Sequence, residues 1–520
     1  MVGRCRRLLP LVVGLMFAVS GPVFSQEITL NSADGSIRLT GELLEFDGES
    51  YRIVSKFGEL TVNALGVTCT GLSCPDPGQY AADITISGTV SIVDNLLPGL
   101  IEDFGFLTGQ TVLRQDHGPL GWTYFLSDVA QIPLARLQAT PVNSSQVFAD
   151  LMNEASDLAV SNRPPNQEEV QAAKKAGIGD LSSPVLSQVL AIGGLIFIVS
   201  KQNPISAITL DQAARIYAGE ITNWAELGGY DGPIHLFSHE IGSDQAHEFD
   251  QRIFPESRNS TPASIAYFKS DVAISTAVSV DPFAIGYVGY AGIRNAKPLA
   301  IKGTCGIQQL PTAFTLGSDD YPLTRAYYVF TPDRRLPIFA RNFLGFLDSD
   351  AAQTSIASLG FVGQGLTSLP FYKQQDRAGN AIAHSGDEVT LPELQDFVGK
   401  FADAERLSST FRFADGTTHM DLRSKRNIRV LAQMIEVGDF DGKKLIFAAF
   451  SDTQGSASGN RRISRQRAEQ VAQMVKTAAN RADFGKVEIQ TLGMGEVSPL
   501  ACNEDEAGRK TNRRVEVWVK

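Results

Sequence analysis

A short strand, a glycine-containing polar turn and a helix follow one another after Asp83, and this alternation constrains the fold more than any other feature. Residues 84–86 read Ile-Thr-Ile, residues 87–89 read Ser-Gly-Thr, and apolar residues then recur at helical spacing from Val93 to Phe104. Similar alternation continues to about residue 370, which predicts an α/β fold. The first turn directs backbone N–H groups towards one point and suits an anion, although an ordinary strand–helix unit gives the same pattern.

The segments on either side of this region differ from it. Residues 26–80 contain short strand-like runs separated by turn pairs such as Asp34-Gly35, which predict a small β domain. Residues 376–404 mix polar, charged and glycine residues with a weak amphipathic helix, and we interpret them as a linker. Residues 405–520 contain an apolar strand, a helix face and an alternating final strand, which predict a compact α+β domain. The chain is therefore expected to be multidomain, with the α/β domain over residues 81–375.

The charge of the chain is uneven. The whole chain of 520 residues has a net charge of −11, which argues against a general nucleic-acid binder. Residues 405–520 nevertheless contain 20 basic and 15 acidic residues. Two regions with different partners are therefore expected.

The first 25 residues have the pattern of a cleaved export signal. Three arginines within residues 4–7 precede an apolar stretch from Leu8 to Ser20, and residues 23–25 offer small residues before a cleavage site at Gln26. The apolar stretch is too short for a bilayer span, and a short membrane anchor is the alternative. Cys5 precedes the apolar stretch, so it is not placed as a lipid-bearing cysteine would be. We therefore expect an exported, periplasmic protein.

Export into an oxidising compartment makes disulfides permissible. Cys69 and Cys74 lie five residues apart in a turn-rich segment, and we expect them to form a disulfide. Cys305 and Cys502 could pair across domains or stay as buried free thiols, and free thiols are the interpretation favoured here. The cysteine spacing does not fit a zinc site.

The strongest motifs lie near the C-terminus. Asp452 ends an apolar strand at a glycine-containing turn, and Arg467 lies in the first turns of the next helix. Such a carboxylate and guanidinium could hold a ligand that bears both an ammonium and a carboxylate. An internal Asp–Arg salt bridge is the alternative. The surrounding blocks are DTQG (452–455), Asn460, ISRQRA (463–468), GMGE (493–496) and GRKTNRRVE (508–516).

These blocks resemble the OmpA-like peptidoglycan-binding domain over residues 405–520. The resemblance implies that Asp452 and Arg467 grip the diaminopimelate of the peptidoglycan stem peptide, with Asn460 between them in the sequence. It also implies association with the cell wall and outer membrane. Ser451 stands where the family usually has Thr, Ile463 replaces Leu, and no ligand-gripping charge is lost.

The middle region resembles the solute-binding (PstS-like) component of phosphate ABC transporters. The clearest block reads IYAGEITNWAEL over residues 216–227, and Gly232-Pro233-Ile234 follows it. The resemblance implies a two-lobed periplasmic-binding fold of the second type over residues 81–375 and a small oxyanion, such as phosphate, as the ligand. An ABC transporter permease is considered as a further partner.

The resemblance carries three ligand-binding segments onto this chain, with departures in two of them. Asn162 replaces an Asp that accepts a phosphate proton, His239 replaces an Arg, and Asp244-Gln245 replaces Gly-Thr. An Asp beside an anion is unfavourable unless it is protonated or paired, for which Arg163 is one candidate. A histidine in place of Arg predicts anion binding that strengthens as the pH falls through neutrality. The expected ligand-binding residues are Gly88, Thr89, Val90, Ser161, Asn162, Arg163, His239, Gly242 and Ser243.

Neither catalysis nor a metal site is expected from the residue pattern. His235, His239, His247 and Asp244 are residue types that bind metals, but His235 and His239 flank a strand end and do not share a helix face. No cofactor is expected, and an enzyme acting on phosphate esters has no support beyond the anion-binding turn. The sequence therefore predicts a periplasmic solute-binding protein for phosphate or a related oxyanion, anchored non-covalently to peptidoglycan. The alternative is a wall-associated structural or sensory protein whose lobes no longer bind phosphate.

Overall fold

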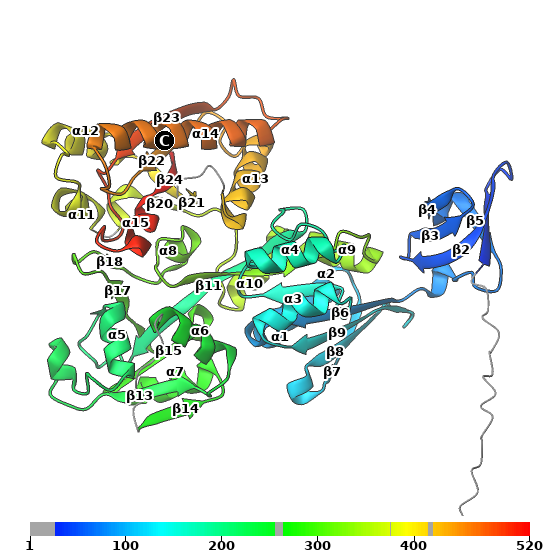
Figure 1. Cartoon of the computed structure of the whole chain (residues 1–520), viewed down its shortest axis with the longest axis horizontal. Helices are drawn as coiled ribbons and strands as arrows, with labels where there is room; N and C mark the ends of the chain where they lie inside the picture. Colours follow the sequence, from blue (N-terminus) through cyan, green and yellow to red (C-terminus); the bar gives the residue numbers. More distant parts are fainter. Residues whose placement is uncertain (1–26, 255–263, 375, 414–419) are drawn as a thin grey trace, which may run out of the picture. The chain divides into compact units, whose positions relative to one another are not determined.

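The computed structural model describes residues 27–254, 264–374, 376–413 and 420–520 (Figure 1). The expected signal peptide, residues 1–25, lies outside the described residues. The chain divides into two compact units, residues up to Tyr80 and residues from Ala81 onwards. Within the described ranges, no helix is long and apolar enough to cross a membrane.

The first unit is an antiparallel five-stranded sheet in the order β4-β3-β2-β1-β5. Alternating residues bury one face, with Ile28, Leu30, Tyr51 and Ile53 in its core. A disulfide joins Cys69 of β5 to Cys74 in the following turn. The strands are β1 (Glu27–Ser32), β2 (Arg38–Phe46), β3 (Ser50–Ser55), β4 (Gly58–Asn63) and β5 (Val67–Thr70).

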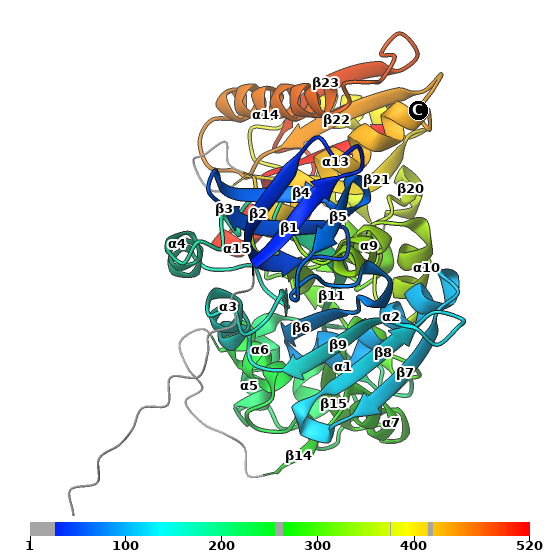
Figure 2. The same ribbon diagram turned by 90° about the vertical axis from the view of Figure 1, so that its right-hand side faces the viewer.

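The second unit begins with one half of a two-lobed α/β domain, which we call lobe 1. Its strands continue one sheet in the order β19-β10-β6-β9-β8-β7, and Figure 2 shows β6, β9, β8 and β7 side by side. The strands are β6 (Ala82–Gly88), β7 (Thr111–Asp116), β8 (Trp122–Ser127), β9 (Pro133–Pro141), β10 (Leu158–Ser161) and β19 (Thr324–Phe330). The helices are α1 (Val90–Asn95), α2 (Leu97–Leu107), α3 (Ser144–Met152), α4 (Gln167–Lys175), α9 (Ile338–Leu347) and α10 (Asp350–Ser358).

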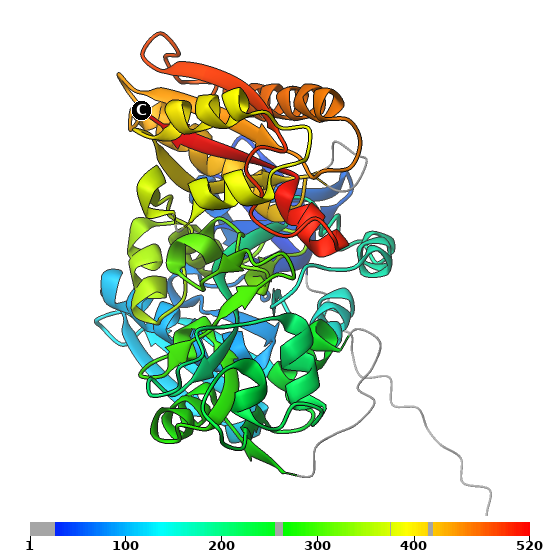
Figure 3. The same ribbon diagram turned by 90° about the vertical axis from the view of Figure 1, so that its left-hand side faces the viewer.

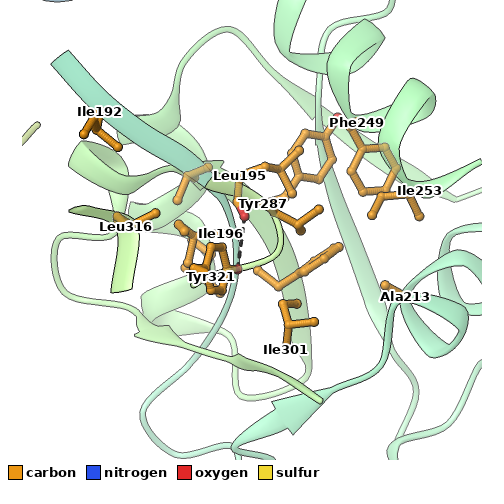
Figure 4. Packing of buried hydrophobic residues seen from close by; sticks show 14 of the residues in the cluster. Ile192, Leu195, Ile196, Ala213, Phe249, Ile253, Tyr287, Ile301, Leu316 and Tyr321 are labelled. Atoms are coloured by element: carbon orange, nitrogen blue, oxygen red, sulfur yellow. Dashed lines mark hydrogen bonds between the residues drawn. The ribbon is translucent and has the colours of Figure 1, made fainter. Parts of the chain in front are cut away.

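The other half, lobe 2, shares the long strand β11 (Ser187–Val199) with lobe 1. Residues of β11 up to Gly194 pair with β19, whereas residues from Leu195 pair with β15. An aromatic and aliphatic core fills lobe 2 (Figure 4). Its strands are β12 (Ala207–Ile208), β13 (His235–His239), β14 (Ile265–Phe268), β15 (Ala284–Gly289), β16 (Lys297–Pro298), β17 (Ala300–Lys302) and β18 (Gln308–Gln309). Its helices are α5 (Leu210–Tyr217), α6 (Asp244–Ile253), α7 (Asp271–Val280) and α8 (Ala313–Gly317).

The C-terminal domain is a five-stranded sheet in the order β20-β21-β24-β22-β23 with helices on both faces (Figure 3). Both faces of β22 are covered, which explains why its residues are apolar without alternation. The strands are β20 (Ser368–Pro370), β21 (Glu405–Arg412), β22 (Lys444–Phe450), β23 (Glu488–Gly495) and β24 (Arg514–Val519). The helices are α11 (Arg377–His384), α12 (Leu391–Phe401), α13 (Leu422–Val437), α14 (Ala457–Ala478) and α15 (Glu506–Asn512).

Residues 376–404 are not the linker expected from the sequence. They form α11 and α12, and α12 buries Phe397 and Phe401 against Phe450 and Trp518 of the sheet. Strand β20 also pairs with β21, so the sheet begins before residue 376. Most of the polar residues that suggested a linker lie on the solvent side of short helices whose few apolar residues cover the second face of the sheet. Arg377 is the exception, because it is buried and pairs with Glu516.

Contacts join the C-terminal domain to the two-lobed domain. Cys305 of lobe 2 and Cys502 form a disulfide, which corrects the expectation of two free thiols. Their separation of 197 residues leaves no local sequence pattern that could reveal the pair. Arg406 donates to both oxygens of Asp320 at 2.6 and 3.0 Å, and both side chains are buried. Burial alone raises the pKa of Asp320, but Arg406 outweighs it and holds that pKa below the usual value.

Candidate functional site

A cavity of about 370 Å³ opens beside the end of β22 in the C-terminal domain. Asp452 leaves the strand there, and its Oδ1 accepts a hydrogen bond from the Gln454 backbone N–H at 3.0 Å. Arg467 of α14 lines the same cavity, and its guanidinium carbon lies 5.8 Å from the centre of the Phe413 ring. We call this cavity the charged pocket; its lining residues are Ser451, Asp452, Gln454, Asn460, Ile463, Arg467, Glu506 and Arg513.

Asn460 holds the loop that carries Asp452. Its buried Nδ2 donates to the backbone carbonyls of Asp452 and Gln454 at 3.2 and 3.0 Å, and to Glu496 Oε1 at 2.7 Å. The Asn460 Nδ2 hydrogens are therefore used in bonds within the protein. Asn460 lies at the charged pocket and positions the loop that carries Asp452.

Two charged residues of the charged pocket, Glu506 and Arg513, were not predicted from the sequence. Arg513 Nη1 donates to Asp452 Oδ2 at 2.6 Å, and Arg513 Nη2 donates to Glu506 Oε1 at 2.5 Å. The bonds from Arg513 and then Arg509 lower the pKa of Glu506. Arg513 belongs to the motif GRKTNRRVE, but a motif gives no indication that its arginine reaches a residue 61 positions earlier.

The second candidate site lies between the lobes, and we call it the interlobe site. Gly88 and Val160 are partners in the parallel pair β6 and β10, and the Thr89 N–H donates to the Val160 carbonyl at 3.0 Å. A Cβ on Gly88 would lie 2.2 Å from Val160 Cγ2 and 2.7 Å from Val93 Cγ2, so this turn needs glycine. The carboxyl ends of β6 and β10 therefore place the first two expected segments, 88–90 and 161–163, next to each other.

Two hydroxyl groups at the start of α1 are buried without a partner among the described residues. Thr89 Oγ1 and Ser91 Oγ have no hydrogen-bond partner among the described residues, and their side chains are 0% and 7% exposed. A buried hydroxyl without a partner is costly, and a bound polar ligand would remove that cost. Ser91 was not among the residues expected from the sequence.

Arg163 is engaged with the protein. Its guanidinium forms a fork with both oxygens of Glu169 at 2.7 Å, and its Nε donates to Ser144 Oγ at 3.1 Å. Arg163 was one candidate partner for Asp244, and the structure pairs Arg163 with Glu169 instead. Ser161 is fully buried and its Oγ accepts from the Arg163 N–H at 3.2 Å, whereas Asn162 is half-buried.

The third expected segment, residues 239–245, reaches the first through Asp244. The Val90 N–H donates to Asp244 Oδ2 at 3.3 Å, which joins lobe 1 to lobe 2. Burial raises the pKa of Asp244 above its usual value. Gly242 has a φ of 86°, and Ser243 caps α6 by accepting from the Ala246 N–H at 3.2 Å. A carboxylate of the protein thus accepts the N–H that the sequence assigned to a ligand oxyanion.

His239 is buried at the end of β13, and its Nε2 lies 2.9 Å from Asp271 Oδ1. Arg325 of β19 pairs with Glu248 of α6 nearby. Neither residue was predicted as part of a site from the sequence. Arg325 lies 4.9 Å from the centre of the Tyr327 ring. Arg163, Arg325 and His239 around the interlobe site therefore each face a carboxylate of the protein.

The histidines considered for a metal have separate partners. His235 Nδ1 lies 2.7 Å from Asp281, and His247 Nε2 lies 2.9 Å from Gln251. A group of three potential ligand atoms within 4.8 Å occurs at Cys305, Cys502 and Glu504. Both sulfurs of that group are joined in a disulfide, which leaves a single carboxylate.

Two protein families match the chain over separate ranges. Residues 123–351 match the PBP superfamily domain, and residues 412–513 match the OmpA family. This chain joins a PBP superfamily domain to an OmpA family domain. The charged pocket lies within the OmpA match, whereas Gly88–Val90 precedes the PBP match.

Different relatives match the two domains. The phosphate-binding protein PstS of Borreliella burgdorferi is 26% identical over 226 residues, covering 42% of this chain and 77% of that protein. The outer-membrane lipoprotein YfiB of Pseudomonas aeruginosa is 30% identical over 113 residues, covering 22% of this chain and 64% of that protein. The structure of an ABC-type phosphate transport receptor from Vibrio cholerae aligns with a TM-score of 0.40 and 21% identity. That alignment covers 54% of this chain and 99% of the receptor.

Proposed function

We propose that this protein is a periplasmic solute-binding protein for phosphate or a related small oxyanion, held non-covalently on peptidoglycan by its OmpA domain. It resides in the cell envelope, associated with the wall and outer membrane, and an ABC transporter permease is the partner implied for its solute. Binding, not catalysis, is the proposed activity.

The charged pocket is the observation that carries this proposal. Asp452 offers a carboxylate to an ammonium group, and Arg467 offers a guanidinium that suits a carboxylate. Diaminopimelate carries both groups on one carbon, so a single ligand end satisfies both side chains. The bond from Arg513 Nη1 to Asp452 Oδ2 orients the Asp452 carboxylate before a ligand arrives.

Sedimentation with diaminopimelate-type peptidoglycan tests the proposal. Asp452→Ala and Arg467→Ala should each weaken binding by a few kcal/mol, on the order of a hundredfold, because a charge-assisted pair loses one partner. Arg481→Ala is the matched control, since Arg481 pairs with Glu436 on the surface and does not line the charged pocket. Equal sedimentation of all three variants with the parent protein would reject the proposal.

The unpartnered hydroxyls of Thr89 and Ser91 support the binding of an oxyanion at the interlobe site.

The ion pairs around the interlobe site favour a second candidate function. Arg163, Arg325 and His239 each face a protein carboxylate, and Asp244 accepts the Val90 N–H. These contacts fit a wall-associated structural or sensory protein whose lobes bind no phosphate. Calorimetric titration of the full chain with phosphate and sulfate separates the two, because the second function predicts no heat of binding.

A further inference from the structure

Two chain segments connect the lobes of the PBP domain and together form its hinge. The first is β11, which changes partner strand between Gly194 and Leu195. The second is the return segment, residues 318–323, which leads from α8 into β19. Figure 4 shows the bond that joins them: the Tyr321 hydroxyl donates to the Leu195 carbonyl at 3.1 Å. Any change in the angle between the lobes must pass through these two segments.

Three arginines of the OmpA domain hold the return segment and its approach. Arg406 forms its buried fork with Asp320, and Arg412 binds the side chain and the carbonyl of Asp319 at 2.9 and 2.6 Å. Arg423 binds the other carboxylate oxygen of Asp319 at 3.0 Å. Asp319 has a φ of 61°, in the left-handed region that residues other than glycine adopt uncommonly, and the bonds from Arg412 and Arg423 hold it there.

The OmpA domain also contacts the PBP domain on both sides of the hinge. The Cys305–Cys502 disulfide attaches it to lobe 2. Helix α13 reaches lobe 1, where Arg426 Nη2 lies 3.5 Å from Asp348 Oδ1. Rotation of one lobe against the other must therefore strain or break one of these attachments, or move the OmpA domain.

Arg412 continues from the hinge towards the charged pocket. Its Nη1 donates to the carbonyl of Thr511 at 2.7 Å, in the last turn of α15. The same helix begins with Glu506, and Arg513 follows its last residue. Glu506 and Arg513 both line the charged pocket, and Arg513 binds Asp452 there. The Arg412 guanidinium thus links Asp319 in the return segment to α15, and residues at both ends of α15 line the charged pocket.

We infer that the OmpA domain braces the hinge of the PBP domain through Arg406, Arg412 and Arg423, and that occupancy of the charged pocket and opening of the lobes influence each other. The bracing of the hinge is inferred from the contacts alone. The coupling between the charged pocket and the lobe angle rests in addition on the proposed wall binding. Because binding linkage is reciprocal, a ligand that favours one lobe angle must in turn alter affinity at the charged pocket.

Distance measurements between spin labels on the two lobes test the brace without any ligand. Labels attach at Leu113→Cys in lobe 1 and Tyr230→Cys in lobe 2, both exposed positions, in the full chain carrying Cys5→Ser. Arg412→Gln and Asp319→Asn should broaden and shift the interlobe distance distribution. Arg481→Gln, the matched control on the OmpA surface, should leave the distribution unchanged. An unchanged distribution in folded Arg412→Gln and Asp319→Asn protein would overturn the brace.

Addition of meso-diaminopimelate to the same labelled protein tests the coupling. The distribution of the parent protein should shift on binding, and Arg412→Gln should bind diaminopimelate without this shift. Binding without a shift in the parent protein would overturn the coupling. A failure of diaminopimelate to bind would overturn the proposed wall binding, and the coupling with it, while the brace is decided by the ligand-free measurement.

Discussion

At the scale of single residues, what each candidate site offers a ligand depends on how its charged side chains are paired. Asp452 and Arg467 were expected at one site, and both line the charged pocket. Arg163 and Asp244 were considered as partners, yet the fork of Arg163 belongs to Glu169. Glu169 is six residues from Arg163 and also caps α4, and only the turn between them brings the carboxylate back to the guanidinium.

Asp244 gives a prediction about pH at the interlobe site. Its carboxylate occupies the Val90 N–H, so an ionised Asp244 opposes a bound anion, and burial raises its pKa. Because the pKa of Asp244 is higher in the folded protein than in the unfolded chain, protonation of Asp244 at low pH stabilises the fold. A protonated Asp244 also carries no charge that would repel a bound anion. Both benefits fade as the pH rises through the raised pKa. Sulfate, whose charge is constant near neutrality, should therefore bind more tightly as the pH falls from about 8 towards the usual aspartate pKa of ~3.9.

Calorimetry of Asp244→Asn checks this prediction. The variant should bind sulfate or phosphate at pH 8 more tightly than the parent by about one to two orders of magnitude, on the order of 1.4–2.8 kcal/mol. Much of its pH dependence should disappear. Asp250→Asn, on the exposed side of the same helix, is the control. An affinity for anions that is the same in the parent and in Asp244→Asn would contradict this role of Asp244.

At the scale of elements, patterns with a local physical cause were predictable. Thr209 and Gln212, three residues apart, form the capping box that starts α5, and the uninterrupted apolar run over residues 445–450 lies within a strand buried on both faces. Helices α11 and α12 were not predicted as part of the domain, because only a few of their residues are apolar. Their stability comes from the sheet face that they cover, which short-range periodicity does not report.

Phe397 in α12 tests whether residues 376–404 belong to the folded domain. Its side chain is fully buried against Phe371, Phe401 and Phe450, so Phe397→Ala should lower the free energy of unfolding by about 3–5 kcal/mol. Urea unfolding measures the change. Leu391→Ala, at an exposed position of the same helix, should change it by less than about 0.5 kcal/mol. If the two variants were equally stable, residues 376–404 would be a linker and not part of the folded domain.

A protein truncated to begin at residue 405 lacks both helices. It is therefore a poor substitute for the full chain in wall-binding experiments.

At the scale of the whole molecule, the second unit has a topology that separates partners by long stretches of chain. Cys305 and Cys502 are 197 residues apart, and Asp320 and Arg406 are 86 residues apart. Each pair joins the two domains, so it depends on how their surfaces meet. The domain order and the fold classes follow from local patterns, whereas docking depends on which surfaces meet.

The two disulfides provide a prediction with an internal control. Replacing Cys305 and Cys502 by Ser removes a cross-link that closes a long loop, and should destabilise the second unit by about 2–4 kcal/mol. All three tryptophans, Trp122, Trp224 and Trp518, are buried in that unit, so their fluorescence follows its unfolding and not that of the first unit. Replacing Cys69 and Cys74 by Ser removes the disulfide of the first unit and should leave the midpoint of the fluorescence transition unchanged.

Non-reducing peptide mapping of the parent protein should recover both cross-linked pairs. Free, alkylatable thiols at 305 and 502 in unreduced protein would contradict the interdomain disulfide. A fluorescence transition equally displaced in both double variants would instead show that the first unit contributes to the stability of the second.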